Sequence, residues 1–240
     1  LEVNPRASRS VPFVGKSTGL PLAQSASPLL GGHKPKEYSL HDYQKQPHFT
    51  VKMPVFTSKK FPEVDALLGP EMKSTGEGMG SAREFPQALA KALLSSRATL
   101  PTGGNAFVSV KNKDKRSTLL IARKLHDLGF KLVATEGTAR ALRKGGLKAR
   151  TVGKVMEGGA SVVDLVQKGE ITFIMNTPSG GPARRDSGAI RRAAVTHSIM
   201  YFTTLAGAQF AVQALEAYQA GDFTVESLKT LYALPEGERE

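Results

Sequence analysis

The first ten residues carry side chains that could bind a metal ion and a phosphate group. Residues 1–4 alternate apolar and polar types, which predicts a half-buried strand. Glu2 and Asn4 are two positions apart, so both side chains leave one face, and both present the oxygen ligands that Mg²⁺ prefers. Arg6 and Arg9 follow, and guanidinium groups pair well with phosphate oxygens. The stretch therefore predicts one corner of a metal- and phosphate-binding site.

A second group of polar residues follows strands predicted further along the chain. Gly137 allows a close backbone approach, and the hydroxyls of Thr135 and Thr138 would lie beside free N–H groups at a helix start. This predicts a phosphate cradle, although Thr138 could instead be only the N-cap of its helix. The polar residues at or near predicted strand ends are Ser109, Lys115, Thr135, Thr138, Lys154 and Asn176. Together they favour one anion-binding pocket. Asp186 lies near a later helix start, where the helix dipole alone would stabilise it.

The elements that must position these residues alternate along residues 84–217. Helices are expected at 85–95, 113–128, 138–144, 162–168, 187–196 and 206–217. Strands are expected at 106–110, 131–134, 150–152, 171–175 and 200–203. Such alternation predicts βαβ units and a parallel sheet, and ligands of these sheets bind beyond the carboxyl ends of the strands. The predicted fold class is therefore α/β, with the anion pocket at that edge.

Residues 1–80 are rich in Pro, Gly and Ser and predict loops, short strands and a helical turn or two packed against something larger. The segments 34–36 and 52–54 combine Lys and Pro and are expected to interrupt any long regular element. The charged tail at 235–240 is expected to be frayed.

Composition limits the classes of partner. The chain of 240 residues has no cysteine, which excludes disulfides, thiolate metal sites and a cysteine nucleophile and is compatible with a cytoplasmic location. Its formal net charge of +12 favours anionic partners. No apolar run approaches the length of a membrane span, and neither zinc-finger nor RNP motifs nor interleaved aromatic and basic residues are present. We therefore expect a phosphorylated small molecule rather than a membrane or a nucleic acid.

Several motifs together resemble one family. ATEGTA, MNTPSG, DSGAIRRAA and YFTTLAGA resemble the methylglyoxal synthase-like domain that closes the large subunit of carbamoyl phosphate synthetase. KFPEVDALLGPEMKSTGEGMG resembles the stretch that precedes that domain, and LEVNPRASRSVPFVGKSTGLPLA resembles the end of the second ATP-grasp domain. The resemblance implies a C-terminal part of that subunit. It predicts an ATP-grasp remnant and connector at 1–96 and an allosteric domain at 97–240, with residues 59–80 as the route between them.

For the synthetic reaction, the resemblance implies that Glu2 and Asn4 ligate Mg²⁺ or Mn²⁺ on the phosphates of ATP. Arg6 and Arg9 would contact the phosphoryl group that is transferred to carbamate. The complete enzyme would be a cytoplasmic ligase that makes carbamoyl phosphate from glutamine-derived ammonia and bicarbonate, for pyrimidine and arginine biosynthesis. It would pair with a small glutaminase subunit. The present chain alone is expected to be inactive.

For regulation, the resemblance implies a nucleotide effector, UMP or IMP. Lys115, Thr135, Thr138 and Lys154 would hold its phosphate, in the same pocket as Ser109. Asn176 and Asp186 would face the base and ribose.

The resemblance also places Tyr201 and Thr203 at an ornithine site between this domain and the preceding one. Met53 stands where the family often has an acidic residue that helps to hold the amine, which argues against ornithine activation.

A stand-alone lyase acting on a triose phosphate is the alternative function, since methylglyoxal synthase shares the fold and the phosphate cradle. That reaction needs a carboxylate base within a Gly-Gly-Asp type of loop. Here Gly181 is followed by Pro182, and the next carboxylate is Asp186.

Overall fold

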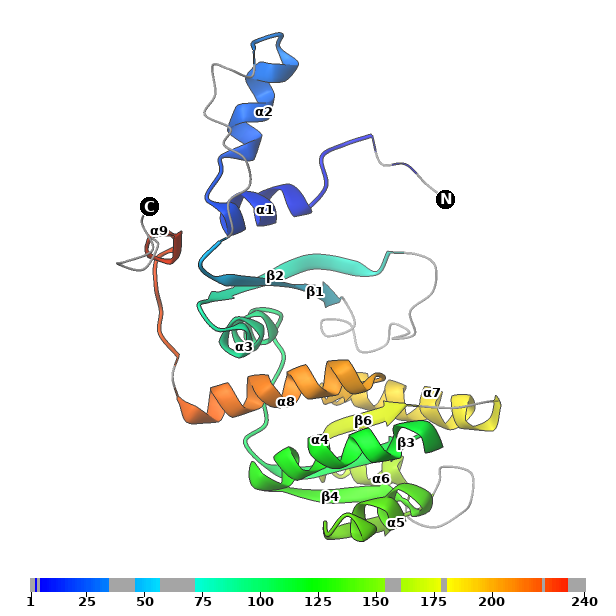
Figure 1. The fold of residues 1–240 in the computed structure, drawn as a ribbon. Coiled ribbons are helices and arrows are strands. Elements are labelled where there is room, and N and C mark those ends of the chain that lie inside the picture. The colour runs from blue at the N-terminus through cyan, green and yellow to red at the C-terminus, as the bar shows by residue number, and fades with distance from the viewer. Residues whose placement is uncertain are drawn as a thin grey trace.

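The computed structural model describes residues 3, 5–34, 46–56, 72–153, 161–177, 181–221 and 223–232, with the backbone alone at 181–185. The elements are stacked in layers (Figure 1). An N-terminal part, made of α1 (Ser10–Thr18), α2 (Leu22–Leu30) and the hairpin of β1 (Phe49–Phe56) and β2 (Ser74–Ala82), lies at one end. A C-terminal part, built around a parallel sheet over residues 104–221, lies at the other end, and helix α3 (Phe85–Ser95) lies between the two.

Five parallel strands of the described residues form the sheet of the C-terminal part. They are β3 (Gly104–Val110), β4 (Phe130–Thr135), β5 (Ala149–Val152), β6 (Ile171–Thr177) and β7 (Met200–Phe202). Their order in the sheet is β5-β4-β3-β6-β7. The first strand, β3, is therefore central, with β4 and β5 on one side of it and β6 and β7 on the other. The strand order therefore reverses between β3 and β6, and ligands of open parallel sheets bind beside such a reversal. The predicted α/β class with a parallel sheet is confirmed.

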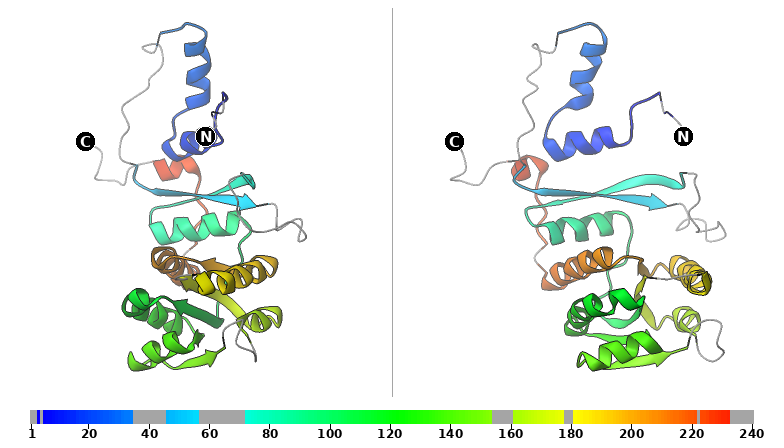
Figure 2. Two further views of the ribbon diagram at one scale, coloured as in Figure 1. Left: turned by 90° about the vertical axis from the view of Figure 1, so that its right-hand side faces the viewer. Right: turned by 45° about the vertical axis from the view of Figure 1, so that its right-hand side comes forward.

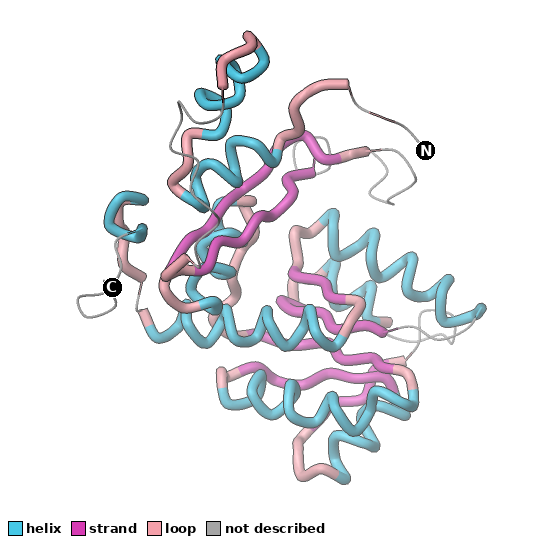
Figure 3. The backbone as a smooth tube through the Cα atoms, turned by 45° about the horizontal axis from the view of Figure 1, so that its top comes forward, coloured by secondary structure: helices cyan, strands magenta, loops and turns pink. Residues whose placement is uncertain are grey.

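Helices cover both faces of this sheet (Figure 3). One face carries α4 (Lys115–Asp127), α5 (Glu136–Lys144) and α8 (Leu205–Ala220), whose buried residues join Val108 and Ala134 in one apolar core. The other face carries α6 (Val162–Gln167) and α7 (Gly181–Thr196) over Phe107 and Val133. Successive strand residues therefore enter opposite cores, and both faces exclude water, as continuous apolar strands require.

The helices and strands predicted for residues 84–217 are all present, with ends that differ by a few residues. The largest difference is α7, which begins at Gly181 rather than at residue 187. A short 3₁₀ helix at Asn112–Asp114 also separates β3 from α4, where one continuous helix from 113 was expected.

The N-terminal part contains more regular structure than predicted. Helices α1 (Ser10–Thr18) and α2 (Leu22–Leu30) precede an antiparallel hairpin of β1 (Phe49–Phe56) and β2 (Ser74–Ala82). The prediction that residues 52–54 interrupt regular structure is wrong, because β1 runs through them and Pro54 is paired in register with Glu77. In the described residues this sheet has two strands, and an edge strand tolerates proline because one side of it needs no donor.

Two predictions for the ends of the chain lie largely outside the described residues: the strand at 1–4, of which only Val3 is described, and the frayed tail at 235–240. One short helix was not predicted. Helix α9 (Leu228–Tyr232) follows α8 and returns to the N-terminal part beside α1 (Figure 2). No helix among the described residues is long and apolar enough to cross a membrane.

Candidate functional site at the carboxyl edge of the parallel sheet

Three of the predicted site residues form a row across neighbouring strands. Ser109 of β3 is the register partner of Asn176 of β6, and its Oγ lies 3.2 Å from Oγ1 of Thr135 at the end of β4. All three side chains share the sheet face that carries α6 and α7, because each is two positions beyond a residue of that core. The structure thus brings Thr135, Ser109 and Asn176 together beside the reversal in strand order.

Lys115 reaches the first turn of α5 from the neighbouring helix. Its Nζ lies 3.1 Å from the position that a Cβ on residue 137 would occupy, so the ammonium group lies directly beside the backbone of Gly137. Thr135 precedes α5 in extended conformation and makes no side-chain cap, so it does not satisfy the N–H groups of the first turn. An ammonium group beside the positive end of a helix is unfavourable unless an anion lies between them. This arrangement can hold a phosphate or a carboxylate.

The alternative interpretation, in which Thr138 is only the N-cap of its helix, is wrong. Thr138 lies inside α5 with 2% of its surface exposed, and its Oγ1 accepts a hydrogen bond of 3.2 Å from the backbone N–H of Val110. The hydroxyl of Thr135 also donates to it, at 3.4 Å. Thr138 therefore fixes α5 against the end of β3 and holds Thr135 in the cradle.

The start of α4, and with it Lys115, is fixed by a second polar contact. The carboxylate of Asp114 accepts a hydrogen bond of 2.9 Å from the hydroxyl of Thr177 at the end of β6. The ammonium group of Lys111 lies 3.5 Å from the same carboxylate. The turn between β3 and α4 is thereby fastened to β6, which sets the direction in which Lys115 leaves the helix.

Asn176 belongs to a buried polar cluster that the sequence did not reveal. Its Nδ2 donates to Ser187 Oγ at 3.2 Å and to the hydroxyl of Tyr201 at 3.4 Å, and these two hydroxyls lie 3.1 Å apart. The guanidinium group of Arg191 lies 5.7 Å from the centre of the Tyr201 ring. Ser187 was missed because a serine in the first half of a helix has no distinctive pattern. Its one signal was its place directly after Asp186.

Asp186 lies inside α7, five residues after its first residue Gly181, so the expected position near a helix start is wrong. Its Oδ1 is buried and has no hydrogen-bond partner among the described residues. This oxygen could accept a hydrogen bond from a hydroxyl group of a ligand. Lys154, the remaining residue predicted for the phosphate, lies outside the described residues.

The two residues of the expected ornithine site, Tyr201 and Thr203, lie in β7 and directly after it. The Tyr201 side chain packs on the face that carries α6 and α7, whereas Met53 of β1 packs against the core of the opposite face. Thr203 is exposed. The described residues therefore do not bring Met53 to Tyr201, and the ornithine site stays a prediction.

The predicted catalytic corner is only partly described. Glu2 and Asn4 lie outside the described residues. Arg6 is exposed and donates to the carbonyl of its neighbour Ala7 at 3.3 Å. Arg9, just before α1, donates to the carbonyl of Ser74 at 3.1 Å. Over the described part of the chain, no group of three or more His, Cys, Asp or Glu residues is placed to hold a metal ion.

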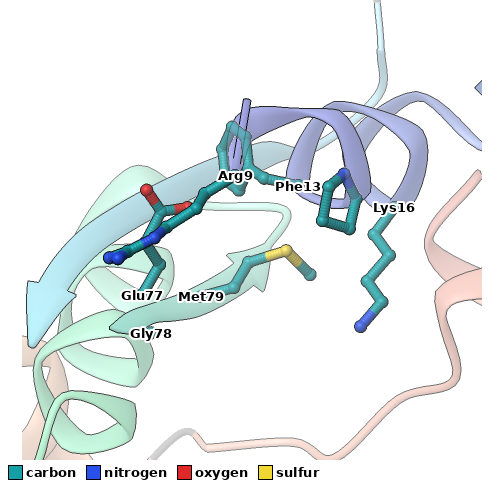
Figure 4. Close-up of a pocket in the computed structure, with 7 residues that line it drawn as sticks. Arg9, Phe13, Lys16, Glu77, Gly78 and Met79 are labelled. Atoms are coloured by element: carbon teal, nitrogen blue, oxygen red, sulfur yellow. The ribbon is translucent and has the colours of Figure 1, made fainter. Parts of the chain in front are cut away.

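A pocket of about 280 Å³ lies between α1 and β2 (Figure 4). Its lining combines two cationic side chains, an apolar floor and one carboxylate: Arg9, Pro12, Phe13, Lys16, Glu77, Gly78 and Met79. Glu77 is already paired with Lys52, at 3.1 Å. The two lining cations could attract an anion, but the structure does not link this pocket to the cradle at the sheet edge.

Comparison with known proteins identifies the C-terminal part. Residues 117–203 match the MGS-like domain family. This segment includes most of the residues predicted for the nucleotide site, from Thr135 to Asp186, whereas Ser109 and Lys115 precede it.

The whole chain resembles one kind of protein. It is 48% identical over 239 residues to the carbamoyl phosphate synthase large chain of Acidobacterium capsulatum, covering 97% of this chain and 22% of the relative. It is 44% identical over 245 residues to the carbamoyl phosphate synthase large chain, C-terminal section, of Methanocaldococcus jannaschii, covering 97% of this chain and 40% of the relative. The corresponding protein of Methanopyrus kandleri is 46% identical, and 44% of its length is covered.

The chain thus spans less than half the length of each of these relatives, while they match nearly all of it. Nearly all of the chain therefore matches carbamoyl phosphate synthase large chains, in two of these relatives their C-terminal section, and residues 117–203 match the MGS-like domain.

Proposed function

We propose that the carboxyl edge of the parallel sheet binds a nucleoside monophosphate, UMP or IMP, and that this nucleotide regulates the enzyme of which the chain is part. The observation that carries the proposal is the Lys115 ammonium group over the first turn of α5, beside the row of Thr135 and Ser109. A phosphate at this point would neutralise the lysine and accept hydrogen bonds from backbone N–H groups and hydroxyls.

The two ends of the nucleotide would meet different groups. Lys115, Thr135 and Lys154 would contact the phosphate, with Thr138 holding Thr135 in place. Asn176 would face the base, since its side chain lies in the same register row further from the cradle. The unpartnered oxygen of Asp186 suits a ribose hydroxyl, which can donate to it.

The catalytic part of the proposal concerns the complete large chain. There, Glu2 and Asn4 would hold Mg²⁺ or Mn²⁺, and their oxygens fit such a hard cation. The metal would offset charge on the phosphates of ATP, while Arg6 and Arg9 would bind the phosphoryl group that is transferred to carbamate. A small glutaminase subunit would supply ammonia. The relatives named above support this function rather than a triose phosphate lyase.

The direct test is calorimetric titration of UMP and of IMP into the 240-residue chain, beside two single-lysine variants. Lys115→Ala should weaken nucleotide binding by about 10- to 100-fold, because a charged hydrogen bond is lost. Lys113→Ala removes an exposed lysine of the same turn and should leave the affinity within about twofold.

Saturable binding of one nucleotide per chain that Lys115→Ala weakens would support the regulatory role and the place of the phosphate. If the folded chain binds neither UMP nor IMP, the effector proposal is rejected. If Lys113→Ala weakens binding as much as Lys115→Ala does, the phosphate does not lie at α5.

A further inference from the structure

Helix α1 is held by polar contacts at both of its ends. None of its residues is fully buried, and Val11 and Phe13 are half-buried. At its N-terminal end, Nζ of Lys52 donates to Ser10 Oγ at 2.9 Å. At its C-terminal end, the hydroxyl of Tyr232 donates to the carbonyl oxygen of Lys16, and Nε2 of His48 lies 3.1 Å from the carbonyl oxygen of Ser17. We therefore expect α1 to be held less firmly when the contacts at either end are lost.

The contact at the C-terminal end comes from α9, which is itself well anchored. The Ser227 hydroxyl accepts from the backbone N–H of Thr230 at 3.1 Å, and Leu231 is buried with 3% of its surface exposed. Arg83, between β2 and α3, donates to the carbonyl of Thr230 at 3.3 Å. Helix α9 therefore offers a firm base for the side chain of Tyr232.

Tyr232 joins several elements at one point. Its ring packs against Gly19, where a Cβ would approach ring carbon Cδ2 to 3.1 Å, and its centre lies 5.6 Å from that of the His48 ring. Gly19 has φ +73° and ends α1. Burial raises the pKa of Tyr232 above its ordinary value of 10.0, so the phenol keeps the proton that it donates. The C-terminal end of α1 is thus closed by an aromatic ring and a hydrogen bond from the far end of the chain.

This contact gives the MGS-like domain a second connection to the N-terminal part. The first runs from β2 through α3 to β3, whereas the second leaves α8 and reaches α1 through α9 (Figures 1 and 2). Helix α1 begins directly after Arg9, whose guanidinium group is held only by the Ser74 carbonyl among the hydrogen bonds of the described residues. The direction of Arg9 therefore depends on where α1 lies.

We propose that α9 clasps the C-terminal end of α1 and so positions Arg9 for the synthetic reaction, which makes Tyr232 a positioning residue. The inference rests on the proposed role of Arg9. The clasp itself can be tested without that role, because it predicts how firmly α1 is held in the 240-residue chain.

Hydrogen–deuterium exchange of residues 10–18 tests the clasp. Tyr232→Ala should raise exchange in α1 by about tenfold and leave β3 and β6 unchanged, because only local opening becomes easier. Tyr232→Phe keeps the ring and loses the hydroxyl, so the increase should be roughly two- to tenfold. Lys229→Ala is the matched control, an exposed residue of the same helix. Equal exchange of α1 in Tyr232→Ala and Lys229→Ala would overturn the clasp.

The positioning role is tested in the complete large chain with its small subunit. Tyr232→Ala should lower kcat for carbamoyl phosphate synthesis about tenfold with KM for ATP unchanged, since a displaced Arg9 weakens transition-state contacts. Tyr232→Phe should restore most of kcat. A simply unfolded N-terminal part would raise KM or reduce the amount of active enzyme instead.

Measuring kcat of Arg9→Ala beside that of Tyr232→Ala separates the proposed role of Arg9 from its positioning by α9. If Arg9→Ala retains full kcat, the proposed role of Arg9 fails. If Arg9→Ala is impaired while Tyr232→Ala keeps full kcat, the role of Arg9 stands and the positioning by α9 is overturned.

Discussion

Lys115 shows how one side chain acquires a function from its neighbours. On its own it is one of many cations in a chain with a net charge of +12. Its distinction is that its ammonium group lies at the first turn of α5, where the helix dipole already favours negative charge. Two positive features facing one space bind an anion more strongly than either does alone.

A stability measurement can test whether Thr138 has a structural role and does not contact the phosphate directly. Thr138→Val keeps the shape of the side chain but leaves the N–H of Val110 without the acceptor it has in the structure. We expect a loss of about 1–3 kcal/mol in the free energy of unfolding, measured by urea denaturation. Thr118→Val is the matched control, because that buried hydroxyl only donates to a carbonyl of its own helix end, Asp114. A similar loss in both variants would show that the Val110 contact is not special.

At the scale of elements, the close packing of α3 on the hairpin depends on small residues in β2. A Cβ on Gly80 of β2 would overlap the backbone oxygen of Ala88 and the backbone nitrogen of Ala92. Gly78 is similarly close to the end of α3, where a Cβ would lie 3.0 Å from the carbonyl carbon of Ser95. The strand and helix approach so closely that these positions have no room for a side chain, so the spacing of the two layers follows from them.

Gly80→Ala should therefore separate the hairpin from α3. We expect a loss of about 3 kcal/mol or more in the free energy of unfolding, since backbone atoms must move apart. Gly76→Ala in the same strand is the control, because the nearest atom to its Cβ would be Val55 Cβ at 3.9 Å, and its cost should stay below about 1 kcal/mol. Thermal denaturation of both variants checks this, and equal costs would contradict the close approach.

Helix α6 begins with a capping box, which predicts an acid-sensitive contribution to stability. The carboxylate of Asp164 accepts from the backbone N–H of Ser161 at 2.7 Å and from its hydroxyl at 2.9 Å, and these hydrogen bonds, the backbone one foremost, hold the pKa of Asp164 below its ordinary value of 3.8. Because the folded pKa is the lower one, the stabilisation is present above about pH 4 and is lost as pH falls through the folded pKa.

Urea denaturation at several pH values checks this contribution. The midpoint of Asp164→Asn should lie below that of the wild type at neutral pH, and the gap should close in strong acid. Ser161→Ala keeps the N–H donor and should lose only part of the effect. A gap that does not change between pH 7 and pH 2 would contradict the assignment.

At the scale of the whole molecule, the basic surplus admits two kinds of anionic ligand. A nucleotide pocket should discriminate between bases and saturate at one site, whereas a nucleic-acid surface binds any base and weakens steeply with salt. Because the elements are stacked in layers, a ligand at the sheet edge would lie in a different layer from Arg9. Any effect of the ligand on Arg9 would therefore have to pass through the elements between them.

Nucleotide binding should stabilise the fold by mass action. At about 100 times its Kd, UMP or IMP should raise the free energy of unfolding by about 2.7 kcal/mol. Lys115→Ala, whose affinity should be 10- to 100-fold lower, should gain only about 0.4–1.4 kcal/mol at the same concentration. The measurement is urea denaturation with and without nucleotide at moderate salt. If single-stranded oligonucleotides of any base composition stabilise the chain more than UMP does, and the effect disappears with added salt, the nucleic-acid alternative is favoured.

The sequence by itself determined the elements of residues 84–217 and the edge at which to look for a ligand. Local hydrophobic periodicity marks each helix and strand, and the alternation of the two implies a parallel sheet. Because ligands of such sheets bind at the carboxyl ends of the strands, Ser109, Thr135 and Asn176 could be selected before their contacts were known.

Only the tertiary structure decided which side chains meet. Register and helix packing join Ser187 and Tyr201 to Asn176 and turn Thr138 towards the backbone of β3. Pairing on one side alone lets β1 continue through Pro54. The contact of Tyr232 with Lys16 spans 216 residues of sequence. Such contacts depend on the packing of distant segments, to which the local pattern of residues gives no guide.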